Sequence, residues 1–239
     1  MKIAILGYGK MGRAIEEIAI SRGHEIVLQV NSSNKHTLNE EAIKKAEVAI
    51  EISTPESAVE NILLCFSAGV PVVCGTTGWL ERLGEVTSVC NRKKLAFLYA
   101  SNFSIGVNVF FEINKILAGL MIHQSQYDIS ITETHHTEKK DAPSGTAISL
   151  AHEILERIIR KKLWVNEPTN DPEEIPIISK RLDDIPGTHQ VKYSSNIDTI
   201  EIIHTAHTRK GFASGAVTAA EWILDKKGLF DMRDVLGLK

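Results

Sequence analysis

Short apolar runs alternate with amphipathic segments through the first hundred residues. The runs are rich in Val, Ile and Leu and are continuous, as strands buried on both faces of a parallel sheet should be. They occupy residues 2–6, 25–30, 47–52, 71–74 and 95–99. Between them, residues 10–22 and 55–68 repeat apolar positions at helical spacing. Strand and helix in alternation predict a doubly wound α/β domain with a parallel sheet.

The pattern changes after Asn102. It predicts a helix over 106–121, a strand over 126–134 and a helix over 144–161, followed by the polar stretch NEPTNDPEEIP. Two strand-like runs, THQVKYSS and TIEIIHTAH, lie close together and are predicted to pair antiparallel. A last helix over 213–226 and the segment GLFDMRDVLGL should pack back on the first domain. We therefore predict one domain of residues 1–103 plus 213–239 and a second, α+β domain of residues 104–212.

Composition excludes several classes of protein. The 239 residues carry a formal net charge of −3, without the basic excess of a nucleic-acid surface. No apolar run reaches the roughly 18 residues of a membrane span, and the start MKIAIL is typical of a strand rather than a signal peptide. Cys65, Cys74 and Cys90 are scattered, which favours core thiols in a reducing cytoplasm. We expect a cytoplasmic protein without nucleic-acid or membrane partners.

A glycine motif follows the first predicted strand. The sequence Gly7-Tyr8-Gly9-Lys10-Met11-Gly12 fits G-x-G-x-x-G and opens the first predicted helix. In this context Gly7 permits a tight turn, Gly9 lets a pyrophosphate approach the backbone, and Gly12 lets helix and strand pack closely. The motif predicts a Rossmann-type, dinucleotide-binding domain.

The end of the second strand leaves the choice of dinucleotide open. A carboxylate there would hold the ribose 2′-hydroxyl of NAD, but the sequence is VNSSNK, residues 30–35. Its hydroxyls and Lys35 could bind the 2′-phosphate of NADPH, or the segment is a polar loop that faces water. We expect NADPH or NADH as cofactor.

The segment ETHHTEKKDAPSGTA, residues 133–147, contains two adjacent histidines, two adjacent lysines and a Pro-Ser-Gly-Thr turn just before a predicted helix. Successive strand residues point to opposite faces, so only one of His135 and His136 can face a cleft from a strand. A helix start at Ser144 to Thr146 offers free N–H groups that suit an anion. With a Lys ammonium and an imidazole, this segment predicts a pocket for a small carboxylate substrate.

A metal site built from the histidines is the weaker interpretation. His135, His136, His204 and His207 could supply imidazoles, but the chain lacks an H-E-x-x-H helix. His204 and His207 lie on a strand-like run that would place them on opposite faces. We expect no bound metal.

The same segment closely resembles the signature of the 4-hydroxy-tetrahydrodipicolinate reductase (dihydrodipicolinate reductase) family. GYGKMG, CGTTGW, ASNFSIGVN, HTRKGFASGAV and GLFDMRDVL agree with the family in the same order along the chain. The resemblance implies reduction of 4-hydroxy-tetrahydrodipicolinate, by way of dihydrodipicolinate, to tetrahydrodipicolinate in the diaminopimelate route of lysine biosynthesis. It also implies a homotetramer built through the second domain, which would bind the substrate.

The resemblance also implies roles for individual residues. His135 matches the proton donor and Lys139 the cationic catalytic residue. The positions that match substrate contacts are His136, Lys139, Ser144, Gly145, Thr146 and Arg209. Those that match the cofactor site are Gly7, Lys10, Met11, Gly75, Thr76, Thr77, Ala100, Asn102 and Phe103.

The chain departs from the family pattern at three places, and three alternatives stay open. No acidic residue stands near residue 31, which leaves the preference between NAD and NADP open. Lys10 stands where many relatives have Arg, which keeps a charge but loses bidentate geometry. Residues 162–196 are short and polar, so we expect trimmed loops there. The alternatives are a dinucleotide-binding sensor without catalysis, a metal-dependent hydrolase, and a related two-domain oxidoreductase of amino-acid metabolism.

Overall fold

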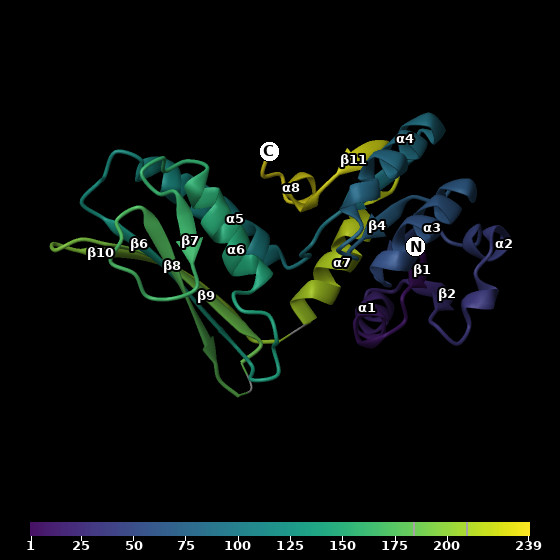
Figure 1. Cartoon of the computed structure of the whole chain (residues 1–239). Coiled ribbons are helices and arrows are strands. Elements are labelled where there is room, and N and C mark those ends of the chain that lie inside the picture. Colours follow the sequence, from purple (N-terminus) through teal and green to yellow (C-terminus); the bar gives the residue numbers. More distant parts are fainter. Residues whose placement is uncertain (184, 209) are drawn as a thin grey trace. The chain divides into compact units, whose positions relative to one another are not determined.

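The structure is a computed structural model that describes residues 1–183, 185–208 and 210–239. The chain divides into two compact units (Figure 1). One comprises Met1–Ile105 with Lys210–Lys239, and the other comprises Gly106–Arg209. That these units act as a dinucleotide-binding and a substrate-binding domain stays a prediction.

The first unit contains a parallel six-stranded sheet in the order β11-β5-β4-β3-β1-β2. All its ladders are parallel, which confirms the predicted doubly wound sheet. The C-terminal segment supplies β11 beside β5, and so packs on this unit as expected. The strands are β1 (Lys2–Leu6), β2 (Glu25–Val30), β3 (Val48–Glu51), β4 (Val72–Cys74), β5 (Ala96–Tyr99) and β11 (Gly228–Phe230).

Helices cover both faces of this sheet. On one face Ile3 and Ile5 of β1 share an apolar cluster with residues of α1 (Lys10–Ser21), α7 (Lys210–Ile223) and α8 (Met232–Val235). On the other, Ala4 and Leu6 share one with α2 (Glu40–Ile43), α3 (Pro55–Ser67) and α4 (Leu83–Lys93). Two short 3-10 turns, η1 (Lys35–Thr37) and η2 (Leu80–Arg82), complete the unit. Burial on both faces explains why the strand sequences are continuously apolar.

The second unit contains a mixed sheet in the order β10-β9-β6-β8-β7. Its strands are β6 (Asp128–His135), β7 (Leu163–Val165), β8 (Glu174–Arg181), β9 (Gly187–Ser194) and β10 (Thr199–Ala206). The helices α5 (Ile105–Leu120) and α6 (Gly145–Leu155) pack with the inward side chains of the sheet, such as Ile131, Ile177 and Val191. β9 and β10 pair antiparallel, as predicted.

Residues 162–196 contain two strands that the sequence analysis did not predict. This region contains β7 and β8 as well as β9, and β8 pairs parallel to β6. The polar stretch hid β8 because the strand begins within it, at Glu174, while its inward positions are the apolar Ile175 and Ile177. The sequence analysis treated the polar residues as a loop and overlooked the short alternation of apolar and polar positions that follows them.

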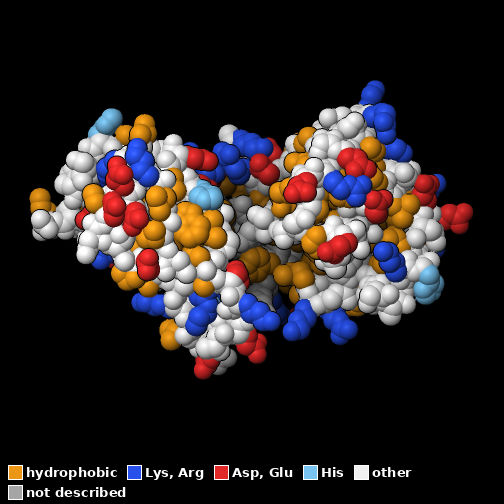
Figure 2. Space-filling model, in the orientation of Figure 1, with side chains coloured by type: hydrophobic (Ala, Val, Ile, Leu, Met, Phe, Trp, Pro, Cys, Tyr) orange, Lys and Arg blue, Asp and Glu red, His pale blue; other side chains and the backbone are white. Residues whose placement is uncertain are grey.

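Three further findings bear on the composition and charge of the chain. Cys65, Cys74 and Cys90 are free and buried, which confirms them as core thiols. Among the described residues, no helix has the length and apolar character needed to cross a membrane. Acidic and basic side chains are interspersed on the face shown in Figure 2.

Candidate active site

The turn between β1 and α1 is shaped by two glycines that cannot be replaced without collision. Gly7 has a φ of 111°, and a Cβ there would lie 2.3 Å from the carbonyl oxygen of Ile52. A Cβ on Gly12 would lie 2.6 Å from the carbonyl oxygen of Gly7. Gly9, in contrast, borders open space. The turn therefore has the two roles predicted for Gly7 and Gly12, and leaves room for a ligand at Gly9.

A cavity of about 640 Å³ opens at this turn. Gly7, Gly9, Lys10 and Met11 line it, so the structure brings these predicted cofactor residues together. Sequence reasoning missed Ser53, Thr54, Ser57 and Asn61, which also line the cavity. They follow β3 or lie on the first turns of α3, and the rule that ligands bind at the carboxyl ends of parallel strands could have found them.

Residues 31–35 form one wall of the cavity. Asn31 and Asn34 are occupied with the turn itself, since Oδ1 of Asn31 accepts from the amides of Ser33 and Asn34, and Oδ1 of Asn34 accepts from the amide of Asn31. Asn31, Ser32 and Lys35 line the cavity. Among the described residues that line it, two are lysines and none carries a carboxylate.

The buried side chain of Glu51 holds two residues of the cavity wall in place. Glu51, at the end of β3, is fully buried, and its Oε1 accepts from the amide and hydroxyl of Ser53 and from Nδ2 of Asn61. Both partners line the cavity. Glu51 thus fixes the polar side chains that a ligand would meet.

The other predicted cofactor residues lie at neighbouring strand ends and do not line this cavity. Gly75, Thr76 and Thr77 follow β4, and Ala100, Asn102 and Phe103 follow β5. Backbone bonds hold both segments at the carboxyl edge of the sheet, from Gly75 N–H to Glu51 and from Ala100 N–H to Cys74. A Cβ on Gly75 would lie 2.7 Å from Cε2 of Phe103, so the Phe103 ring packs against the Gly75 backbone.

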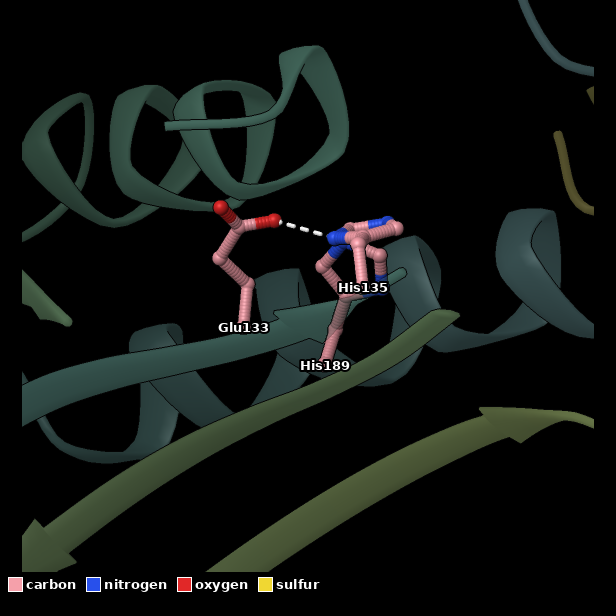
Figure 3. Close-up of side chains that lie close together, drawn as sticks. All are labelled: Glu133, His135 and His189. Carbon is pink, nitrogen blue, oxygen red and sulfur yellow. Dashed lines mark ion pairs between the residues drawn. The ribbon is translucent and has the colours of Figure 1, made fainter. Parts of the chain in front are cut away.

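In the second unit, His135 ends β6 and is 8% exposed. Glu133 precedes it on the same face of the strand and is fully buried. Its Oε2 lies 2.5 Å from Nδ1 of His135 (Figure 3), and its Oε1 accepts a 2.9 Å bond from Nη2 of Arg181. Burial acts to raise the pKa of Glu133, but hydrogen bonds led by the one with His135 outweigh it and hold the pKa well below its usual range. The carboxylate is therefore ionised.

A second histidine packs against the first. The ring of His189, on β9, meets the His135 ring edge to face at 5.0 Å between centroids. Nε2 of His189 lies 3.1 Å from Oγ of Ser144, which also caps α6 by accepting from the amide of Ala147. Burial, aided by the proximity of His135, lowers the pKa of His189 to about 3. His189, which sequence reasoning missed, is thus a neutral support for His135.

The loop between β6 and α6 carries the cationic candidate. Nζ of Lys139 donates to Oδ1 and Oδ2 of Asp141 at 2.8 and 2.9 Å. Arg181 holds the loop backbone, because Nη2 donates to the carbonyl of Asp141 at 2.7 Å. His136 is half-buried beside His135, and Gly145 and Thr146 form the first turn of α6. Arg209, the remaining substrate-side prediction, lies outside the described residues.

Three buried groups here resemble a metal-ligand set. The ligand atoms of Glu133, His135 and His189 lie within 4.8 Å of one another. However, tetrahedral ligands about 2.1 Å from a zinc ion are roughly 3.4 Å apart, which is longer than the 2.5 Å between Glu133 and His135. Arg181 also occupies the other carboxylate oxygen. The spacing favours a shared proton over a metal ion.

Comparison with known proteins gives the family. A model of the N-terminal part of dihydrodipicolinate reductase matches residues 1–103, and one of its C-terminal part matches residues 106–236. The chain belongs to the dihydrodipicolinate reductase family. It is 51% identical over 237 residues to the 4-hydroxy-tetrahydrodipicolinate reductase of Christiangramia forsetii, covering 99% of this chain and 98% of that one. It is 38% identical to the reductase of the same name from Methanoregula boonei, covering 83% and 78% of the two chains.

Solved structures agree with this assignment. A dipicolinate-bound dihydrodipicolinate reductase from Paenisporosarcina sp. TG-14 superposes with a TM-score of 0.79 at 26% identity, covering 97% of each chain. Aspartate semialdehyde dehydrogenase II from Vibrio cholerae shares the fold alone, with a TM-score of 0.55 and 14% identity. The predicted family, the fold class and the prediction of an NAD(P)H-dependent oxidoreductase are confirmed.

Proposed function

We propose that the chain reduces 4-hydroxy-tetrahydrodipicolinate, after loss of water, to tetrahydrodipicolinate with NADPH or NADH, in the diaminopimelate route of lysine biosynthesis. The observation that carries the proposal is the buried Glu133–His135 pair beside a lysine loop and a helix N-terminus. The reaction adds a hydride at C4 and a proton at C3 of a ring with two carboxylates. It therefore needs a proton donor, a cationic group and anion-binding amides.

The second unit supplies these groups. His135 donates the proton, and His136 and Lys139 bind the substrate carboxylates. Gly145 and Thr146 offer the first N–H groups of α6, where a helix attracts anions. The Ser144 hydroxyl is engaged with Ala147 and His189, so its part is to fix these amides. Lys139 exchanges Asp141 for a substrate carboxylate, and Arg209 is proposed as a further substrate contact.

The first unit fits a reduced nicotinamide dinucleotide, which supplies the hydride when it is bound. Gly9 lets the backbone approach the pyrophosphate, and Lys10 and Met11 present the first turn of α1, which has no acidic residue to repel a phosphate. Glu51 holds Ser53 and Asn61 against the cofactor. Gly75, Thr76, Thr77, Ala100, Asn102 and Phe103 contact the nicotinamide half.

We further propose that NADPH is the better cofactor. Lys35 and Ser32 face the cavity where the second strand ends, and the described lining offers no carboxylate for a 2′-hydroxyl. A lysine ammonium and a hydroxyl are suited to a phosphate.

We also propose an oligomeric state and a cellular location for the chain. The sheet of the second unit is covered by helices on one face, while Ile203 and Thr205 of β10 point to the other and are exposed. We propose that this face forms the homotetramer. The buried free thiols support a cytoplasmic enzyme.

Oxidation of NADPH and NADH by the purified chain, with substrate generated freshly by the preceding synthase, tests the function. We expect turnover that depends on the synthase product. Cofactor binding without turnover would favour the dinucleotide sensor, and metal-dependent hydrolysis without oxidation would favour the hydrolase.

A further inference from the structure

We propose that Glu133 and Arg181 are positioning residues that hold the proton donor His135 and the loop of Lys139 in a single arrangement. The inference rests on the proposed function and deepens it, because it names the groups that prepare the proton donor. Neither residue is placed against the substrate; both act through others.

The carboxylate of Glu133 bridges two side chains. One oxygen accepts from Nη2 of Arg181 at 2.9 Å, and the other lies 2.5 Å from Nδ1 of His135. The buried Oε2 and Nδ1 have no other partner among the described residues, so each must satisfy the other. Nδ1 is therefore the nitrogen held by the protein. Nε2 is left to deliver the proton, and the imidazolium gains an adjacent negative charge.

Gly187 lies beside Nε2 of His135, the nitrogen proposed to donate the proton, and its lack of a side chain leaves space for the ring. A Cβ at this position would lie 3.0 Å from Nε2 of His135 and 3.2 Å from Cδ2, closer than side chains normally approach. The first residue of β9 therefore allows the ring to sit against the backbone. The carboxylate on one side and the glycine on the other fix the plane of the imidazole.

Strand pairing explains how one arginine reaches both groups. Arg181 is the register partner of His135 across β8 and β6, and the amide of Leu182 donates to the carbonyl of His135 at 2.8 Å. From this position Nη2 donates to Glu133 and to the carbonyl of Asp141, and Nε donates to the carbonyl of Lys139 at 3.4 Å. A single guanidinium thus joins the His135 partner to the backbone of the Lys139 loop.

Other charged groups around His135 do not provide this link. His189 faces it from β9 and is neutral, and Ser144 at the start of α6 faces His189. The nearby His204 of β10 contributes to the lowered pKa of His189. In the loop, Lys139 and Asp141 are paired with each other. Glu133 is therefore the negative charge that the His135 imidazolium meets first.

Three variants separate the two tasks. In Glu133→Gln, we expect the high-pH fall of kcat to move about one pH unit or more lower, with little change in the KM for the dicarboxylate. In Arg181→Met, the KM should rise because the Lys139 loop is freed, but the high-pH fall of kcat should not move lower, because the Glu133 carboxylate is kept and a competing cation is lost. Arg181→Lys keeps the charge but cannot make every bond, so KM should rise while the pH profile stays near the wild type.

Arg160→Met is the matched control. Arg160 also clamps a loop, since its guanidinium donates to the carbonyls of Met121, Ile122, Gln124 and Tyr127. We expect this variant to lower the thermal midpoint and to leave the pH profile unchanged. A common effect of all arginine losses on the profile would overturn the proposal.

A spectroscopic readout separates this inference from the proposed function. In protein with ¹³C-labelled histidine, the His135 signal is assigned by its loss in His135→Gln. Its titration midpoint should move to lower pH in Glu133→Gln, whether or not the chain turns over the substrate. An unmoved midpoint together with a wild-type pH profile would overturn the role of Glu133. If Glu133→Gln does not fold, the KM of Arg181→Lys decides, and a wild-type value refutes the clamp.

Discussion

The hydroxyl of Ser144 serves two partners at once: it accepts from the amide of Ala147 at 3.2 Å and lies 3.1 Å from Nε2 of His189. The start of α6, which offers the proposed substrate amides, is thereby tied to the ring that packs against His135. His189 is 5% exposed, and burial lowers its pKa to about 3. The folded protein therefore holds this imidazole neutral.

The neutral His189 should make stability depend on pH. In the unfolded chain this histidine is protonated near pH 6.5, while in the folded chain it is protonated only near pH 3. The unfolded state binds more protons between these values, so stability falls as the pH falls, by about 1.4 kcal/mol per unit for one such group. Denaturant unfolding at pH 7 to 4.5 measures this slope.

His189→Gln should remove most of that slope between pH 6.5 and 4.5, above the range where carboxylates titrate. The pKa of His204 is also lowered by burial, so His204→Gln is the control and should remove only a part. A slope equal to the wild type in His189→Gln would contradict a neutral, buried His189.

The cavity at the β1–α1 turn was largely predictable from the sequence. Continuous apolar strands and a glycine turn have local signatures, and the structure places Gly7, Gly9, Lys10 and Met11 around one cavity. The roles of Thr54 and Asn61 were not, because they depend on which strand ends lie beside β1 in the sheet.

The proposed substrate site of the second unit depends more on pairing between distant strands. His135 was visible within its motif, but Arg181 and His189 lie 46 and 54 residues further along the chain, as their numbers show. They meet His135 only through the β6–β8 and β6–β9 ladders. Arg181 was not found because the sequence analysis did not predict β8. No local pattern identifies His189, a lone histidine on β9, as a neighbour of His135.

Loss of either proposed catalytic side chain should slow the reaction. His135→Gln and Lys139→Ala should each lower kcat about 10²- to 10⁴-fold, because an acid or a charge-stabilising group is removed. Lys139→Ala should also raise the KM for the dicarboxylate. Steady-state NADPH oxidation measures both constants.

The adjacent Lys140→Ala is the matched control for Lys139, since Lys140 is exposed on the same loop. We expect it to change kcat and KM less than threefold, about the effect of a lost surface charge. Wild-type rates in His135→Gln or Lys139→Ala would refute their assigned roles.

Two glycines of the β1–α1 turn should respond differently to alanine. Gly12→Ala places a Cβ 2.6 Å from the Gly7 carbonyl and should cost about 1–3 kcal/mol of stability. Gly9→Ala meets open space and should cost about 1 kcal/mol or less, yet should raise the KM for NADPH about tenfold, because the methyl lies where the pyrophosphate approaches. Thermal melts and cofactor titrations separate these effects. A Gly9→Ala enzyme with wild-type cofactor binding would place the phosphates elsewhere.

Cofactor preference should depend on Lys35. It lines the cavity at the end of β2, so Lys35→Ala should raise the KM for NADPH about 10- to 100-fold, the loss of one charge-assisted contact, and change that for NADH less than threefold. Lys44→Ala is the control, because Lys44 is exposed and pairs only loosely with Glu40, at 3.7 Å. Since a phosphate contact is electrostatic, added salt should weaken NADPH binding in the wild type more than in Lys35→Ala. Equal losses for both cofactors would instead give Lys35 a role at the pyrophosphate they share.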